Sequence, residues 1–224
     1  MAQAQSPDDE PILLRDDADG IATLTLNRPG SGNSLSHALV DDLSTMLRQI
    51  ATDADVRVVV LAANGKHFCT GHDLKESIAT KTGDEKRASN AACNAMMQAI
   101  VDLPQPVIAK VRGTATASGC ELMASCDLAV AAQSARFATP GVNIGFWCYT
   151  PQVALSRAVS RKHALEMLLT GELYPSDEAL RMGLVNRVVP DDELDAAVGA
   201  LSATIASKSS AAVSRGKRSF HAQY

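Results

Sequence analysis

The 224-residue sequence predicts an α/β fold, with strands and helices alternating over its first two thirds and helices dominating the remainder. Three observations lead to this expectation. Short apolar, β-branched runs are each bounded by segments that contain Gly, Pro or Asn. Between several of these runs, apolar residues recur at the spacing of a single helical face. Beyond Pro151, nearly every apolar stripe has the helical period.

The chain opens with a predicted hairpin. Residues 12–15 and 21–26 are β-prone, and an Asp-Gly pair just before the second run is a tight-turn signal. Ser36 is placed to cap a helix whose apolar stripe continues to residue 50. The continuous apolar run 56–62 then predicts a strand that is buried on both faces.

The later elements follow from the same two periodicities. Further strands are predicted at residues 107–111, 127–132 and 185–189, and residues 113–119 are predicted to form a loop. Helices are predicted at residues 90–103, from Cys120, and at residues 153–159, 163–169, 177–182 and 193–205, with another helical section beginning at Ser209. The sequence therefore predicts one domain with a helical C-terminal extension.

Charge and cysteine content exclude several classes of protein. The net charge is −4, from 21 basic and 25 acidic residues, which argues against a nucleic-acid partner and against an anionic membrane surface. The five cysteines form no C-x-x-C pair, so neither a metal site nor a disulfide scaffold is expected. The acidic N-terminal stretch lacks an apolar signal region and transit-peptide arginines, which predicts a cytoplasmic protein.

Two glycine-bearing turns are the first candidates for chemistry. One contains Thr70 and Gly71, the other Ser118 and Gly119, and each is expected to follow a buried strand and to precede a helix or loop. Ligands of α/β proteins usually bind at such strand ends. If the backbone N–H groups of Thr70 and Ser118 are free, together they form an oxyanion hole. Ordinary strand-to-helix turns explain the same spacing, so the turns alone leave both interpretations open.

Several motifs follow one another in unbroken order over residues 12–207. They are Thr70-Gly71-His72-Asp73-Leu74-Lys75-Glu76, residues 105–113, Ser118-Gly119-Cys120-Glu121-Leu122, Cys126-Asp127, Phe137-Ala138-Thr139-Pro140, residues 164–171 and residues 179–185. Together they resemble the signature of the crotonase superfamily of enoyl-CoA hydratases and isomerases. Two short segments, 71–76 and 140–145, resemble one subgroup of it in particular.

The resemblance implies a crotonase (ClpP-like) superhelix of repeated strand-strand-helix turns with a helical C-terminal section. It divides the chain into a core domain with an acyl-CoA site, residues 1–190, and a helical trimerisation section, residues 191–224, which is truncated relative to the family. It also implies a homotrimer or homohexamer, an acyl-CoA substrate and no cofactor beyond the CoA moiety.

The same resemblance assigns roles to individual residues. Thr70 and Ser118 would hold the thioester oxygen through their N–H groups, and Glu121 would be the acid–base residue. Glu121 lies in the first turn of its helix, where the helix dipole favours the ionised form. Residues expected to contact the CoA moiety are Arg28, Lys66, Cys69, Gly71, Asp73 and Leu74, and those expected in the substrate pocket are His72, Gly141, Asn143 and Trp147.

One departure from the family pattern affects the expected reaction. Hydratases use a second carboxyl group, and its position is occupied by Gly141, which has no side chain. Losing a positioned acid or base costs about 10²–10⁴-fold in rate, so efficient hydration is not expected. The hypotheses are therefore an isomerase or slow hydratase, a catalytically weak or inactive acyl-CoA-binding protein, and a thioester hydrolase or decarboxylase built on the same oxyanion hole.

Overall fold

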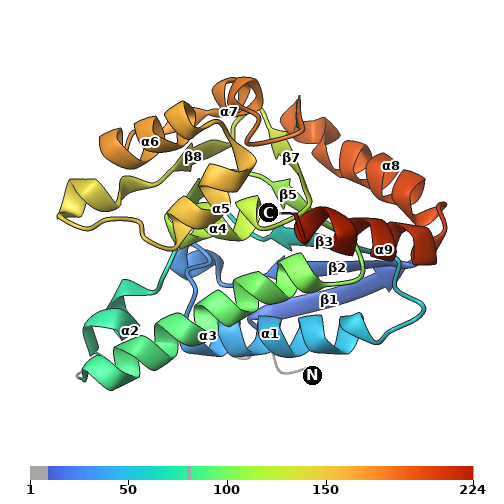
Figure 1. Cartoon of the computed structure of the whole chain (residues 1–224), viewed down its shortest axis with the longest axis horizontal. Helices are drawn as coiled ribbons and strands as arrows, with labels where there is room; N and C mark the ends of the chain where they lie inside the picture. The colour runs from blue at the N-terminus through green and yellow to red at the C-terminus, as the bar shows by residue number, and fades with distance from the viewer. Residues whose placement is uncertain (1–9, 80–81, 224) are drawn as a thin grey trace, which may run out of the picture.

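The computed structural model describes residues 10–79 and 82–223 and has an α/β architecture built on two sheets (Figure 1). The strands are β1 (Leu13–Ala18), β2 (Ile21–Leu26), β3 (Val58–Ala63), β4 (His67–Cys69), β5 (Val107–Val111), β6 (Thr114–Thr116), β7 (Leu128–Ala132), β8 (Arg136–Ala138), β9 (Tyr174–Pro175) and β10 (Arg187–Val189). The helices are α1 (His37–Ala51), α2 (Leu74–Ala79), α3 (Gly83–Asp102), α4 (Ser118–Ala124), α5 (Pro151–Ala158), α6 (Arg161–Thr170), α7 (Ser176–Met182), α8 (Leu194–Ala206) and α9 (Ser210–His221).

The larger sheet has the strand order β1-β2-β3-β5-β7-β10, and it is parallel apart from the β1–β2 hairpin. Its β3 strand is buried on both faces, as its continuous apolar sequence predicts. Val59 and Leu61 belong to the main core, whereas Val58 and Val60 pack in a second core with Leu194 of α8. Residues beyond 190 therefore cover one face of this sheet, and the trimerisation role expected for them stays a prediction.

The smaller sheet, of order β4-β6-β8-β9, is not predicted by the sequence. Its strands are two or three residues long, too short to show a hydrophobic period, and residues 114–116 lie within a segment that the sequence predicts to be a loop. They pair with partners far away in the chain, such as Thr114 with Arg136. Because β4, β6 and β8 are parallel, the turns that follow β4 and β6 leave the sheet at the same edge.

Helix α3 begins earlier than its apolar stripe predicts. Thr82 caps it, and Thr82 and Glu85 form a reciprocal capping box at its first turn. The first turns of α3 are polar and exposed, so the apolar period becomes visible only near Cys93. Figure 1 shows α3 and α1 side by side along the sheet, and the two helices contact each other.

The C-terminal helix α9 is attached to the rest of the protein through the buried side chain of Lys217. Lys217 Nζ donates to Asp127 Oδ2 at 2.7 Å and to the carbonyl oxygens of Ile100 and Gln105 at 3.1 Å each. His221 Nε2 lies 3.1 Å from the other oxygen of Asp127. These contacts join α9 to the end of α3 and to the segments that enter β5 and β7.

Candidate active site

The turns after β4 and β6 pack directly against each other. Gly71, in the first turn, has φ +96°, and a Cβ placed there would lie 3.0 Å from Ala117 Cβ and 3.3 Å from Ser118 N. Only glycine combines that backbone conformation with so close an approach. The two glycine-bearing turns therefore form one surface, although 46 residues separate His72 from Ser118.

The N–H of Thr70 is not free, contrary to the expectation from the sequence. It donates to the carbonyl oxygen of Gly32 at 3.1 Å. The next residues pair with Leu35, which donates to Gly71 O at 2.8 Å and accepts from Asp73 N at 3.1 Å. This parallel bridge leaves the N–H of His72 without an acceptor among the described residues. The available donor in the first turn is therefore two residues beyond the expected one.

The second turn presents the N–H of Ser118. Ser118 is the first residue of α4, so its N–H has no intrahelical acceptor. Ala117, immediately before it, has φ +50° and ψ −126°, a conformation that L-residues rarely adopt. Its own N–H is anchored by the carbonyl oxygen of Ala138 at 2.9 Å. The strained residue thus turns the chain sharply from β6 into α4 and places Ser118 beside the first turn.

Glu121 lies one turn into α4 and is buried, with 6% of its surface exposed. Its Oε2 accepts a hydrogen bond from Thr150 Oγ1 at 2.7 Å. Burial raises the pKa of Glu121 to about 7, although hydrogen bonds from Thr150 and Ser118 favour the ionised form. Position in the first turn alone suggested an ionised group. With a pKa raised to about 7 by burial, both forms are populated near neutral pH.

The side chains of His72 and Ser118 are in direct contact. His72 Nδ1 lies 2.8 Å from Ser118 Oγ. The other ring nitrogen, Nε2, is buried and has no hydrogen-bond partner among the described residues. Burial lowers the pKa of His72, and the nearby charge of His37 lowers it further, so the ring is neutral at neutral pH.

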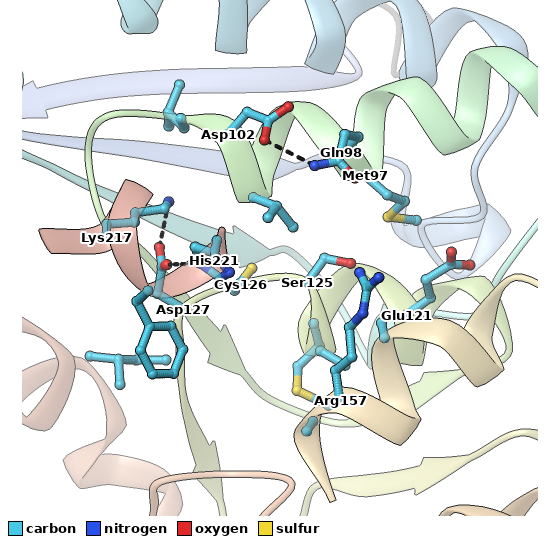
Figure 2. A pocket seen from close by; sticks show the side chains of 18 of the residues that line it. Met97, Gln98, Asp102, Glu121, Ser125, Cys126, Asp127, Arg157, Lys217 and His221 are labelled. Atoms are coloured by element: carbon cyan, nitrogen blue, oxygen red, sulfur yellow. Dashed lines mark hydrogen bonds and ion pairs between the residues drawn. The ribbon is translucent and has the colours of Figure 1, made fainter. Parts of the chain in front are cut away.

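Glu121 faces a cavity of about 1120 Å³ bounded by α3, α4, α5 and α9. Figure 2 shows Glu121 and Arg157 at one end of this cavity and the Asp127–Lys217–His221 cluster at the other. The sequence singled out Glu121 and the Cys126-Asp127 motif among its wall residues, but not Met97 or Arg157, which lie within the predicted helices 90–103 and 153–159. The sequence also did not predict the contact of Thr150 with Glu121, because 29 residues separate them in the chain.

Gly141 lies in a single 3-10 turn, Pro140–Ile144. A Cβ placed on it would lie 2.9 Å from Cys148 Sγ and 2.9 Å from the carbonyl oxygen of Phe146. The position is therefore enclosed by neighbours on the side where a side chain would emerge. Any larger residue requires the turn itself to shift.

Two residues expected in the substrate pocket are committed to structural contacts. Asn143 Nδ2 donates to the carbonyl oxygen of Gly171 at 3.0 Å, and Trp147 Nε1 donates to Gln152 Oε1 at 2.8 Å. Neither of them lines the cavity beside Glu121, whereas Tyr149, two residues further on, does.

The residues expected to contact CoA are only partly available for a ligand. Arg28 forms an ion pair with Asp73 at 3.1 Å and also donates to the carbonyl oxygen of Ser34 at 2.6 Å. Cys69 is fully buried, and burial raises the pKa of its thiol to about 12. By contrast, Lys66 is exposed, and Leu74 has 60% of its surface exposed.

Three further observations concern metal ligands, cysteines and membrane-spanning helices. Within residues 10–79 and 82–223, no group of three or more His, Cys, Asp or Glu side chains is arranged to hold a metal ion. The five cysteines, all of them described, are free. No helix in the same ranges has the length and apolar character needed to cross a membrane.

These features define an α/β protein of the crotonase fold, in which two backbone turns meet beside a buried carboxyl group. The chain belongs to the enoyl-CoA hydratase/isomerase family, whose family model matches residues 16–224.

Individual relatives agree with this assignment. A rat protein named enoyl-CoA hydratase domain-containing protein 3, mitochondrial, is 43% identical over 223 residues, which span 99% of this chain and 74% of the relative. The crystal structure of the human protein of that name superposes with a TM-score of 0.88 at 44% identity, covering 95% of this chain and 84% of that one. An enoyl-CoA hydratase structure from Mycobacterium smegmatis gives a TM-score of 0.93 at 52% identity, covering 96% and 84% of the two chains. The subgroup suggested by residues 71–76 and 140–145 is the one that the rat and human relatives represent.

The expected cytoplasmic location is wrong by the same comparison. The rat, mouse and human relatives are all named mitochondrial, which contradicts the expectation. The physical reason is that an address signal is a segment separate from the folded domain. The prediction rested on the composition of the N-terminal stretch, and the names of the relatives contradict it.

Proposed function

We propose that this protein is an enzyme that binds an acyl-CoA thioester and stabilises its enolate with the N–H groups of His72 and Ser118. The observation that carries the proposal is that the turn with His72 packs against the turn with Ser118, one helical turn before Glu121, and that neither N–H has an acceptor among the described residues. Two convergent backbone donors stabilise a carbonyl oxygen that gains negative charge. Names of the relatives point to the same chemistry.

Glu121 is the proposed acid–base group. A carboxyl group whose pKa is about 7 can both take and return a proton near neutral pH. The cavity of about 1120 Å³ beside it is large enough for an acyl chain. CoA itself is the only further group that the proposal requires, and Lys66 and Leu74 are the exposed candidates among its expected contacts.

The reaction that fits these residues is a proton shuttle by one carboxyl group, as in double-bond isomerisation, or slow hydration. Fast hydration requires a second carboxyl group, and Gly141 supplies none at the position where the family places it. The alternative is a catalytically weak or inactive acyl-CoA-binding protein, favoured by the same observation and by the lack of space at Gly141. A homotrimer or homohexamer remains part of the proposal.

The experiment follows the absorbance of the conjugated enoyl thioester for a series of 2-enoyl-CoA and 3-enoyl-CoA substrates of increasing chain length. Gain of the conjugated absorbance from a 3-enoyl-CoA reports isomerisation, and its loss from a 2-enoyl-CoA reports hydration. Measurable acyl-CoA binding without either change would reject the enzyme and favour the binding protein. Sedimentation of the same samples determines the oligomeric state.

A further inference from the structure

The two turns that carry the proposed N–H donors are anchored to different parts of the molecule. The first turn is bound to the loop before α1, because Thr70 N–H donates to the carbonyl oxygen of Gly32 at 3.1 Å. The second turn is bound to the end of β8, because Ala117 N–H donates to the carbonyl oxygen of Ala138 at 2.9 Å. The separation of the two donors therefore depends on the contacts that join one turn to the other.

Strand pairing ends before it reaches the donors. The last pair of the β4–β6 ladder is Cys69 with Ala115, and its register shifts between His67 and Cys69. Just beyond this pair, Thr116 Oγ1 donates to the carbonyl oxygen of Thr70 at 3.3 Å, which is long for a hydrogen bond from a hydroxyl group. The sheet thus brings the turns together but does not itself fix the residues that follow it.

The side chains of His72 and Ser118 connect the turns at the donors themselves. His72 Nδ1 lies 2.8 Å from Ser118 Oγ, a favourable hydrogen-bond length. Both tautomers of the neutral ring allow this bond, because Nδ1 donates to the hydroxyl oxygen when it carries the hydrogen and accepts from the hydroxyl group when it does not. Ser118 is 3% exposed and His72 is half-buried, so water competes little for the bond.

The residue before Ser118 gives the contact a second effect. Ala117 has φ +50° and ψ −126°, and such a strained conformation persists only where surrounding contacts hold it. The hydrogen bond from His72 is one of these contacts, and it acts on the residue that the strained turn positions.

We infer that the hydrogen bond between the side chains of His72 and Ser118 holds the two N–H donors of the oxyanion hole at a fixed separation. This inference rests on the proposed function. The side chains are positioning groups, because they act through the backbone N–H groups of their own residues. Donors that are fixed in advance stabilise developing charge without a cost of reorganisation, and a displacement of about 1 Å can cost about 10²-fold in rate.

The test removes each side of the hydrogen bond and keeps both N–H groups. Ser118→Ala removes the hydroxyl group, and Ser118→Thr retains one. His72→Asn places an amide near the position of Nδ1 and can keep the bond, whereas His72→Gln places its amide near the position of Nε2 and cannot. Ser89→Ala in α3 is the matched control, because Ser89 Oγ lies 2.8 Å from His37 Nε2 in a bond of the same type.

Turnover of an enoyl-CoA that the wild type converts is measured for each variant, together with its melting temperature. Ser118→Ala and His72→Gln should each lose about 10-fold in kcat with little change in KM, because the donors act mainly on the enolate. The double variant should be no slower than the slower single variant. Ser118→Thr and His72→Asn should recover most of the rate, and Ser89→Ala should match the wild type.

A merely structural hydrogen bond would lower the melting temperature of the variants and leave kcat per folded molecule unchanged, which would overturn the inference. An active His72→Gln beside a slow His72→Asn would also overturn it, since the role would then lie at Nε2. The same holds for a double variant whose loss is the product of the two single losses.

A second measurement separates this inference from the proposed function. If the wild type shows no turnover, the proposed function fails, and the inference is judged by ¹⁵N relaxation dispersion of the His72 and Ser118 amides. Exchange that increases at both amides in Ser118→Ala, and not in Ser118→Thr or Ser89→Ala, supports the inference. Amides that behave alike in Ser118→Ala and the wild type overturn it.

Discussion

Thr150 Oγ1 donates a 2.7 Å hydrogen bond to Glu121 Oε2, and this contact joins the residue that precedes α5 to the middle of α4. It holds one carboxylate oxygen at the edge of the cavity. Because burial raises the pKa of Glu121 to about 7, the same group is sensitive to pH in the range where enzymes usually work. The first two predictions concern this residue.

Glu121→Gln should reduce turnover of the enoyl-CoA substrate by about 10²–10⁴-fold, because the amide cannot exchange a proton. Acyl-CoA affinity should change little, since the amide oxygen can still accept from Thr150. The rates are measured by thioester absorbance, with Glu166→Gln on the exposed face of α6 as a control. Retained activity in Glu121→Gln would remove Glu121 from the mechanism.

Stability should depend on pH through the same carboxyl group. Its pKa rises from 4.5 to about 7 on folding, so the unfolded chain ionises first and the folded state loses relative stability between those values. Each unit of the difference corresponds to about 1.4 kcal/mol. Glu121→Gln should therefore gain stability relative to the wild type as pH rises from 4.5 to 7, with no further gain above. Urea unfolding of both proteins at several pH values checks this, and a constant difference would contradict it.

Gly141→Ala should destabilise the protein by about 1–3 kcal/mol, because its Cβ would overlap Phe146 O and Cys148 Sγ, both at 2.9 Å. Gly141→Glu should therefore fail to raise hydration. Gly199→Ala is the matched control: no atom lies within 4 Å of its new Cβ, and alanine favours a helix interior by about 1 kcal/mol. Thermal melting compares the variants, and a stable, faster Gly141→Glu would show that the turn adapts.

Lys217→Met should weaken the attachment of α9 to the rest of the protein. Lys217 is 7% exposed in its side chain and bridges Asp127 and two carbonyl oxygens, so its loss leaves a half-buried carboxylate and two carbonyl oxygens with fewer partners, at about 1–3 kcal/mol. Hydrogen exchange of the α9 amides should become faster. Arg215→Met, exposed on the same helix, should leave both exchange and stability nearly unchanged. If the two substitutions had equal effects, the positive charge of α9, and not the contacts of Lys217, would hold the helix in place.

Substitutions of Arg28 and Lys66 should have different effects, the first on the stability of the protein and the second on acyl-CoA binding. Arg28→Gln should lower stability by about 1–3 kcal/mol, because Asp73 loses the cation that helps to hold its pKa low. Lys66→Gln should leave stability unchanged and weaken acyl-CoA binding in a salt-dependent manner. Calorimetric titration with CoA at low and high salt makes the comparison. Weaker binding in Arg28→Gln with unaltered stability would place Arg28 in the CoA site instead.

Local periodicity predicted most of the large sheet. The strand 107–111 coincides with β5, and the Ser36 cap starts α1 as expected, because these features depend on residues next to one another in the chain. The small sheet was not predicted, because strands of two or three residues show no hydrophobic period and form only by pairing with distant segments. Thr150 and Arg157 lie beside the same cavity as Glu121 although they are distant from it in the chain, so the sequence did not predict their position.

By itself, the sequence determined the α/β class, the family resemblance, the two turns that carry Gly71 and Ser118, and the position of Glu121 just after the second turn. Only the tertiary structure decided which N–H of the first turn is available, since the acceptor of Thr70 N–H is Gly32, 38 residues earlier. It also decided the raised pKa of Glu121, because burial depends on how α3, α4 and α5 pack. Hydrogen bonding and desolvation act between neighbours in space, and a one-dimensional pattern records only neighbours in the chain.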